Sequence, residues 1–437
     1  MNISSHKTWQ RCNYSLFAGA KLVILCFLIL TVTFLCTTYF TTSYSNLVQI
    51  VSKSNHLPIQ QDKVVEGVGA LPTVPQIKVV EGVKAKEESH FRSLNDSTYT
   101  LGPKINNWDL NRAKWLRHNP GFPNFFSGPK PRVLLVTGSS PKPCANPVGD
   151  HYQVKAIKNK IDYCRIHGID IFYNNALLDA EMAGFWAKLP LLRTLLLSHP
   201  EVEFIWWMDS DAFFTDMAFE PPWDRYEPYN LVFHGWDHLV YKDKNWVGLN
   251  TGSFFLRNCQ WSLDLLDAWA PMGPDGPIRD EAGKLLTGFL KGRPVFEADD
   301  QSAMVYLLVT QEDTWSDKVY FENSYCLHGF WESLVDRYEE MLEKNHPGLG
   351  DDRWPLVTHF VGCKPCGNFS EFPVERCLSK IDRAFNFADN QVLQMYGFAH
   401  KSLNTSSVKR VRNESVGPAS APDEVSIVLY PSVNDRN

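Results

Sequence analysis

Short apolar runs alternate with longer stretches of helical periodicity, and this alternation constrains the fold more than any other feature of the chain. Strands are expected in four runs: Arg132–Gly138, Ile169–Asn175, Glu203–Asp209 and Leu249–Asn258. Helices are expected at Tyr152–Gly168, Gly184–Pro200, Ser262–Ala270 and Asp299–Thr310. Strands separated by helices of this length are typical of βαβ units. The pattern therefore predicts an α/β fold with a mostly parallel central sheet.

An acid pair interrupts the most apolar of these runs. "EFIWWM" is followed at once by Asp209, Ser210 and Asp211. Burying unpaired carboxylates inside a sheet costs several kcal/mol, so we expect both acids beyond the strand's end, where α/β sheets bind ligands. An i, i+2 spacing on extended backbone places both side chains on one side, where they can hold a divalent cation together with phosphate oxygens. The alternative is an Asx-turn or a helix N-cap.

Two further segments offer groups for a phosphate. Gly138 and Ser139 follow the first strand in "VTGSSPKPC", where backbone N–H groups can cradle an anion. Lys188 and Arg193 lie in the second helix and either face a diphosphate or lie on a solvated helix face. These assignments are weaker than that of the acid pair, because a single glycine and two basic residues are common.

The N-terminal part indicates a membrane anchor. Leu22–Phe40 carries no charge and is long enough to cross a hydrocarbon layer about 30 Å thick. Lys7, Arg11 and Lys21 precede it, whereas the next basic residue is Lys53. The positive-inside rule then predicts a single-pass type II protein. The expected layout is a cytosolic tail (1–21), the anchor (22–40), a luminal stem (41–100), the catalytic domain (101–400) and a polar C-terminal tail (401–437).

Glycosylation motifs and cysteines fit a luminal domain. The four sequons begin at Asn95, Asn368, Asn404 and Asn413. Seven cysteines follow the anchor, so at least one is free or pairs between chains: Cys144, Cys164, Cys259, Cys326, Cys363, Cys366 and Cys377. "CKPC" resembles a redox or zinc half-site, but no second CxxC completes a zinc pattern, and structural disulfides are the preferred interpretation. The net charge of -6 gives no reason to expect a nucleic-acid partner.

Several long stretches resemble one family. "MDSDAFFTDM", "GLNTGSFFLRNCQWSLDLLDAWAPMGP", "FEADDQSAMVYLL", "HGFWESLVDRYEEM", "THFVGCKPCG" and "RAFNFADNQVLQMYGF" are similar to the plant xyloglucan 6-xylosyltransferases, whose family also contains galactomannan galactosyltransferases. The similarity runs from about Tyr99 to Asn413. It implies a GT-A nucleotide-sugar-binding fold in the Golgi membrane. It also implies Mn²⁺ as cofactor and UDP-xylose as donor.

The resemblance also implies roles for individual residues. Asp209, Ser210 and Asp211 match the Asp-x-Asp motif, and His359 matches the remaining metal ligand. Lys364 matches the lysine that reaches the diphosphate. Asp299, Asp300 and Gln301 match the acidic cluster beside the transferred sugar. Read without the family, His359 is a core histidine, Lys364 an exposed loop charge, and either Asp299 or Asp300 a helix N-cap.

The activity implied is retaining transfer of xylose to the 6-position of glucose in a β-1,4-glucan. Asp300 is a conceivable nucleophile and Gln301 a stabiliser of the sugar cation, while same-face attack assisted by the leaving phosphate is the other route. Aromatic residues such as Trp236, Trp246 or Trp331 are expected under the glucan. Expected partners are the Golgi membrane and a homo- or hetero-oligomer with other xyloglucan-synthesising glycosyltransferases.

Three alternatives to this activity remain open at the level of the sequence. The first is a galactomannan α-1,6-galactosyltransferase. The second is a weakly active or non-catalytic subunit that organises a xyloglucan-synthesising complex. The third is a type II membrane lectin, which needs no nucleotide site.

Overall fold

The computed structural model describes residues 99–120, 130–144, 147–366 and 371–412, which all belong to one compact unit. The predicted anchor, the predicted stem up to residue 98, and the sequons at Asn95, Asn368 and Asn413 lie outside these residues. Within the described part of the chain, no helix is both long enough and apolar enough to cross a membrane.

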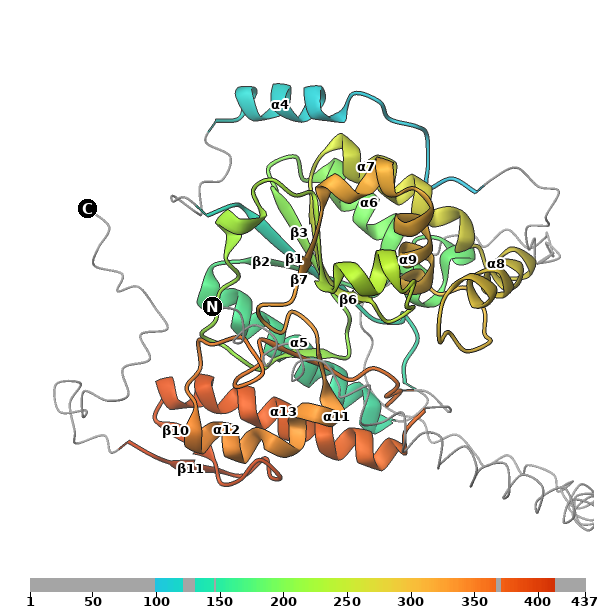
Figure 1. Cartoon of the computed structure of the whole chain (residues 1–437). Coiled ribbons are helices and arrows are strands. Elements are labelled where there is room, and N and C mark those ends of the chain that lie inside the picture. Colours follow the sequence, from blue (N-terminus) through green and yellow to red (C-terminus); the bar gives the residue numbers. More distant parts are fainter. Residues whose placement is uncertain (1–98, 121–129, 145–146, 367–370, 413–437) are drawn as a thin grey trace, which may run out of the picture. The chain divides into compact units, whose positions relative to one another are not determined.

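A six-stranded sheet forms the centre of the described unit (Figure 1). Its strand order is β2 (Asp170–Asn174), β1 (Val133–Gly138), β3 (Phe204–Met208), β6 (Leu249–Arg257), β5 (Leu231–Gly235) and β7 (Val319–Glu322). β1 is parallel to β2 and β3, and β5 is parallel to β7. β6 is antiparallel to both of its neighbours, β3 and β5. The predicted α/β fold is confirmed, and the sheet is mixed.

The antiparallel strand follows from the connection that precedes it. β5 ends at Gly235 and β6 begins at Leu249, so the chain turns back beside the strand it has just left. Antiparallel neighbours need no crossover helix, whereas parallel neighbours do. The sequence pattern of β6 alone could not show this, since a strand buried on both faces is apolar in either direction.

Helices cover both faces of the sheet (Figure 1). α6 (Lys188–Ser198), α7 (Gln260–Trp269) and α9 (Asp300–Thr310) pack on one face, and α5 (Pro147–His167) and α13 (Val374–Met395) on the other. Alternate side chains of β3 point to opposite faces of the sheet. Ile205 and Trp207 pack in the core under α6, α7 and α9, whereas Phe204, Trp206 and Met208 pack in the core under α5 and α13. This two-sided burial explains why the run "FIWWM" contains no polar residue.

A second, small sheet adjoins the acid pair. Its order is β4 (Ala212–Phe214), β9 (Val357–His359) and β8 (Gly329–Phe330). β4 and β9 are antiparallel, and Ala212 is the partner of His359. The pairing places β4, which follows β3 of the main sheet, in register with β9, which is far away in the sequence.

The remaining elements lie around these two sheets. The helices are α4 (Trp108–His118), α8 (Pro277–Phe289), α10 (Glu312–Trp315), α11 (Trp331–Leu334) and α12 (Tyr338–Lys344). β10 (Phe398–His400) pairs with β11 (Val408–Arg410) in an antiparallel hairpin, so regular structure continues past residue 400. Asn404 lies in the loop of this hairpin, is exposed, and accepts a hydrogen bond from Arg383 through its Oδ1 atom.

Both cysteines of "CKPC" form structural disulfides. Cys363 pairs with Cys377, and Cys366 pairs with Cys144. The two cysteines are not bonded to each other, so the redox and zinc interpretations of the motif are wrong. Among the described residues, Cys164 and Cys259 are free thiols.

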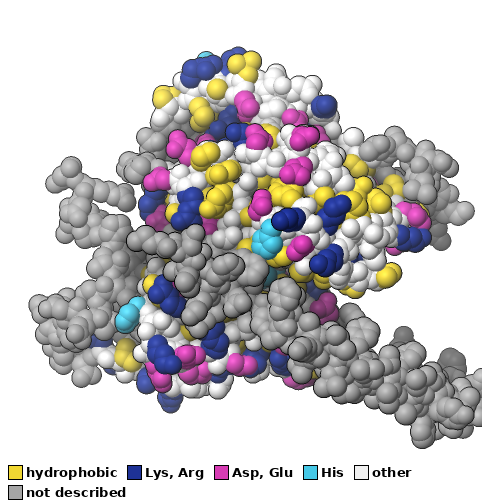
Figure 2. All heavy atoms as spheres, in the orientation of Figure 1, with side chains coloured by type: hydrophobic (Ala, Val, Ile, Leu, Met, Phe, Trp, Pro, Cys, Tyr) yellow, Lys and Arg dark blue, Asp and Glu magenta, His cyan; other side chains and the backbone are white. Residues whose placement is uncertain are grey.

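The surface carries charges of both signs. On the face shown in Figure 2, Lys and Arg side chains are interspersed with Asp and Glu side chains over the described part of the molecule.

Candidate functional site

The acid pair lies in the turn between β3 and β4. The N–H of Asp209 donates to the carbonyl of Gly252 on β6 (2.7 Å), and the N–H of Ala212 donates back to the carbonyl of Asp209 (3.2 Å). Both carboxylates stay partly accessible, with side-chain exposures of 30% and 21%. The acids therefore lie beyond the carboxyl end of a buried strand, as the sequence predicts.

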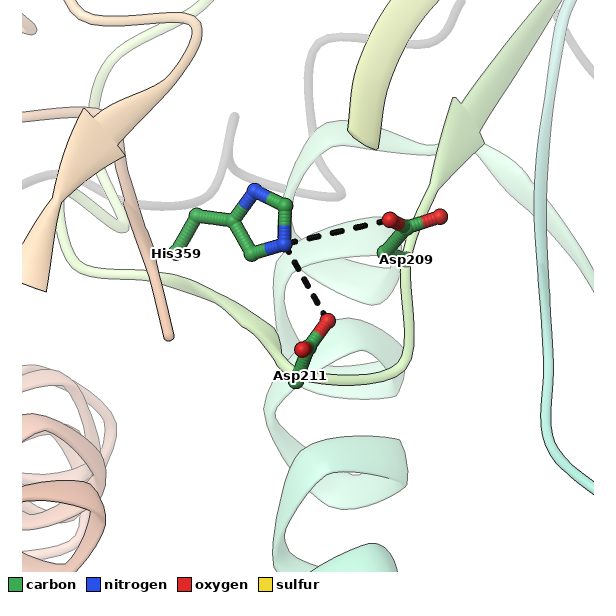
Figure 3. A group of neighbouring side chains, drawn as sticks. All are labelled: Asp209, Asp211 and His359. Atoms are coloured by element: carbon green, nitrogen blue, oxygen red, sulfur yellow. Dashed lines mark hydrogen bonds and ion pairs between the residues drawn. The ribbon is translucent and has the colours of Figure 1, made fainter. Parts of the chain in front are cut away.

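His359 converges on the two aspartates (Figure 3). Its Nε2 atom lies 3.1 Å from Oδ1 of Asp211 and 3.8 Å from Oδ2 of Asp209. One ligand atom from each of the three residues lies within 4.8 Å of the others. One imidazole nitrogen and two carboxylate oxygens form a donor set that suits a first-row divalent cation such as Mn²⁺. The residues present fit the implied metal.

Electrostatics at Asp211 favour its ionised form. Burial raises the pKa of Asp211, but the charges of His359 and Lys364 outweigh burial and hold that pKa below its usual value. Lys364 itself is exposed. Its position allows it to act on a group bound at the acid pair, since its charge already acts on Asp211.

The far side of Asp209 is fixed by two donors. The indole N–H of Trp207 donates to Oδ1 of Asp209 at 2.7 Å. The ammonium of Lys188 lies 3.4 Å from the same oxygen. These contacts occupy Oδ1 and leave Oδ2 directed toward His359 (Figure 3).

Lys188 is buried between two acids. Its side chain is only 2% exposed, and Nζ lies 2.7 Å from Oδ2 of Asp300. Burial lowers the pKa of Lys188, but Asp209 and Asp300 outweigh it and raise the pKa. The alternative of a solvated helix face is therefore wrong for this residue. Arg193 lies elsewhere and donates to the carbonyl of Pro103 (2.6 Å).

The three residues at the start of α9 have different surroundings. Asp299 is the N-cap, accepts from the N–H of Ser302 (2.8 Å) and pairs with buried Arg293 (2.9 Å). Asp300 faces Lys188, and burial raises its pKa despite that partner. Gln301 donates to the carbonyl of Trp246 and accepts from Asn250, both at 3.0 Å. Of the three, Asp300 is linked to Asp209 by their shared contact with Lys188, whereas the carboxylate of Asp299 caps the helix.

Gly138 and Ser139 lie at the carboxyl ends of β1 and β2. The N–H of Ser139 donates to the carbonyl of Asn174 (2.9 Å), and its hydroxyl lies 2.6 Å from that of Tyr173. A Cβ atom at Gly138 would lie 2.6 Å from the same carbonyl, so only glycine fits there. A small cavity of about 10 Å³ is lined by residues of this edge and of the acid turn, among them Thr137, Tyr173, Lys160 and Ser210.

Lys160 and Asn159 are two site residues that the sequence did not reveal. Lys160, which is 1% exposed, donates to the carbonyl of Ala212 at 2.6 Å. Burial lowers the pKa of Lys160 to about 8. Asn159 exchanges two hydrogen bonds with the backbone of Phe214. Nothing in the helical pattern of α5 marks these residues.

Asn250 and Gly252 are also part of the site. Oδ1 of Asn250 accepts from the N–H of Gly252 (2.8 Å), and Asn250 donates to Gln301. A glycine inside a strand pattern often marks a close approach of another group, so this signal was available in the sequence.

Burial restricts which aromatic residues can contact an acceptor. Trp331 is 1% exposed and packs against Phe360 and Phe372, and Trp236 is 6% exposed. These two residues cannot offer a ring face to a glucan, because their faces are already covered. Trp246 is partly exposed, next to Phe296, and its carbonyl holds Gln301.

The chain is similar in sequence to known proteins. A sequence model of the galactosyl transferase GMA12/MNN10 family matches residues 129–370. The probable xyloglucan 6-xylosyltransferase 1 of Oryza sativa subsp. indica is 71% identical over 341 residues, covering 78% of this chain and 76% of the relative. Xyloglucan 6-xylosyltransferase 2 of Arabidopsis thaliana is 69% identical over 359 residues, covering 82% and 76%.

A solved structure matches more distantly. A glycosyltransferase involved in glycosylation of the major capsid of PBCV-1 is 13% identical with a TM-score of 0.36, covering 58% of this chain and 100% of that one. The extent of the family match and the identity to the plant proteins establish one conclusion: the chain belongs to the galactosyl transferase GMA12/MNN10 family.

Proposed function

We propose that this protein is a xyloglucan 6-xylosyltransferase with a GT-A fold, which transfers xylose from UDP-xylose to a β-1,4-glucan. The observation that carries the proposal is the convergence of Asp209, Asp211 and His359 at the end of β3, in a chain 69–71% identical to relatives named for this activity. The identity to relatives named as transferases favours an enzyme over a lectin.

The side chains around the cluster suggest a division of roles. Asp209, Asp211 and His359 would hold Mn²⁺, which as a Lewis acid stabilises negative charge on the departing diphosphate. Lys364 adds a positive charge on the exposed side of the same site.

Asp300 and Gln301 would lie on the sugar side. The carboxylate of Asp300 is held by Lys188, and the amide of Gln301 is held by Trp246 and Asn250, so both side chains are positioned before a substrate binds. Asp300 then acts either as a nucleophile or as a carboxylate that stabilises the sugar cation during same-face attack. Trp246 is partly exposed and its carbonyl accepts from Gln301, so we expect this residue, of the three predicted tryptophans, to contact the glucan.

The main alternative is a galactosyltransferase, because the family description names galactosyl transfer. The choice of donor sugar distinguishes it from a xylosyltransferase. The test is hydrolysis and transfer by the purified chain, comparing UDP-xylose with UDP-galactose, with and without Mn²⁺, and using a cello-oligosaccharide acceptor. Metal-dependent transfer from UDP-xylose supports the proposal. Preference for UDP-galactose supports the galactosyltransferase. Donor and metal binding without transfer supports an organising subunit.

We further propose a type II anchor in the Golgi membrane and N-glycosylation at one or more of the four sequons, on the basis of the uncharged segment Leu22–Phe40. Protease digestion of sealed Golgi vesicles tests the orientation. Degradation of the catalytic domain in intact vesicles would contradict it.

A further inference from the structure

Lys188 joins two acids that come from different parts of the chain. Its ammonium lies 2.7 Å from Oδ2 of Asp300, 3.4 Å from Oδ1 of Asp209 and 3.1 Å from the carbonyl of Thr251. The side chain is 2% exposed, so the charge is shielded from water. Its partners are acid residues on both sides, one of which is a ligand in the proposed metal centre.

This arrangement opposes cation binding. A charge in a partly buried site acts more strongly than the same charge in water. The ammonium already neutralises part of the charge of Asp209, and it would repel a divalent cation held by the opposite oxygen of the same carboxylate.

We propose that Lys188 is a positioning residue that weakens the protein's own hold on the divalent cation, so that the cation binds and leaves together with the nucleotide diphosphate. The inference rests on the proposed function, since it requires a nucleotide-sugar donor. Two carboxylates and one imidazole, with one carboxylate partly neutralised, bind a cation loosely, and the diphosphate oxygens then supply the missing ligands and charge.

The geometry allows the charge of Lys188 to be separated from its structural role. Without Lys188, Asp209 still accepts the hydrogen bond from Trp207 at 2.7 Å, which keeps Oδ2 directed toward His359. Loss of the ammonium should therefore remove repulsion without releasing the ligand. Loss of the negative charge of Asp300 should have the opposite effect on cation binding, because that charge compensates the ammonium of Lys188.

The test measures Mn²⁺ affinity of the full chain without nucleotide, by calorimetry at pH 7.5. Lys188→Met should bind Mn²⁺ at least roughly tenfold more tightly than wild type. Asp300→Asn should bind it more weakly, because Lys188 then acts on Asp209 uncompensated. Arg193→Met removes a cation from the same helix, away from the site, and should leave the affinity unchanged.

The two substitutions are expected to change Mn²⁺ affinity in opposite directions, so the result is decisive. Unchanged or weaker binding in Lys188→Met, or unchanged or tighter binding in Asp300→Asn, overturns the inference. If Lys188→Met fails to fold, Asp300→Asn decides alone. A parallel titration with UDP separates the two proposals: a wild-type chain that binds no Mn²⁺ even with UDP contradicts the proposed function itself.

Discussion

Gly252 lies directly against the imidazole of His359. A Cβ atom at this glycine would lie 2.2 Å from Cε1 and 2.8 Å from Nδ1 of the histidine. The carbonyl of Gly252 also accepts the N–H of Asp209. Gly252 thus positions two ligands: its missing side chain leaves space for the His359 ring, and its carbonyl holds the N–H of Asp209.

Replacing Gly252 by alanine should displace the His359 ring. The added methyl cannot coexist with Cε1 at 2.2 Å, so the imidazole must leave the position in which Nε2 faces both aspartates. We expect Mn²⁺ affinity to fall by roughly tenfold or more, since correctly placed ligands dominate affinity at a three-residue site. Calorimetric titration in the presence of UDP measures the effect.

Gly288→Ala is the matched control for this substitution. Gly288 lies in α8, and a Cβ there meets no atom within 4 Å. Alanine should be neutral or slightly stabilising, because it has the higher helix propensity. Normal Mn²⁺ affinity in Gly252→Ala would show that His359 tolerates the methyl and that the glycine is not needed for space.

His359→Ala and Lys364→Ala should differ in what they disturb. Loss of His359 removes a nitrogen ligand, so binding of Mn²⁺ alone and of Mn²⁺ with UDP should both weaken. Loss of Lys364 should weaken UDP while leaving the ligands for Mn²⁺ in place. Thermal unfolding without ligand, with Mn²⁺, and with Mn²⁺ plus UDP measures these changes. Full ligand-induced stabilisation in His359→Ala would assign this residue to the core instead.

Buried His234 should make the metal-free protein less stable in acid. Burial lowers the pKa of His234 from 6.5 to about 4. Below pH 6.5 the unfolded chain therefore gains a proton that the folded chain does not take up until about pH 4. The free energy of unfolding is therefore unaffected by His234 above pH 6.5. Between pH 6.5 and about 4 it falls by about 1.4 kcal/mol per pH unit as the pH is lowered.

Comparison with His234→Phe isolates this effect. The free energy of unfolding of both chains, measured with a chelator between pH 7.5 and 4.5, should show a shallower loss in the variant. Asp216, whose pKa is raised to about 6 by burial, gives an opposite slope over part of the range, but it is common to both chains. Parallel curves would mean that His234 is not responsible for the acid sensitivity.

Asp216 should stabilise the fold through backbone contacts. Its carboxylate accepts from the N–H groups of Ala218, Phe219, Gly348 and Gly350. Asp216→Ala leaves these donors unpaired, so we expect a loss of at least about 2 kcal/mol of unfolding free energy. Urea unfolding measures the loss. Asp351→Ala, which removes contacts to exposed Arg353, should cost much less.

The sequence determined the main elements because their signals are local. The apolar run Phe204–Met208 predicted a strand buried on both faces, and the acids after it predicted a site at the strand's end. The N-cap alternative for the start of α9 also rested on a local signal, and the structure places Asp299 there. Such signals depend on neighbours within a few residues, which a sequence displays directly.

Only the tertiary structure shows how distant residues reach the acid pair. His359 reaches Asp211 because Ala212 and His359 are partners across β4 and β9, and no periodicity in the chain encodes that pairing. Lys188 looked equally suited to water or phosphate, yet folding buries it against Asp209 and Asp300. Strand register and burial arise from contacts between segments that are remote in sequence. The residue pattern therefore located the acids, and the family resemblance predicted His359 and Lys364 beside them, whereas packing decided the pairing that brings His359 to Asp211 and the burial of Lys188 against two acids.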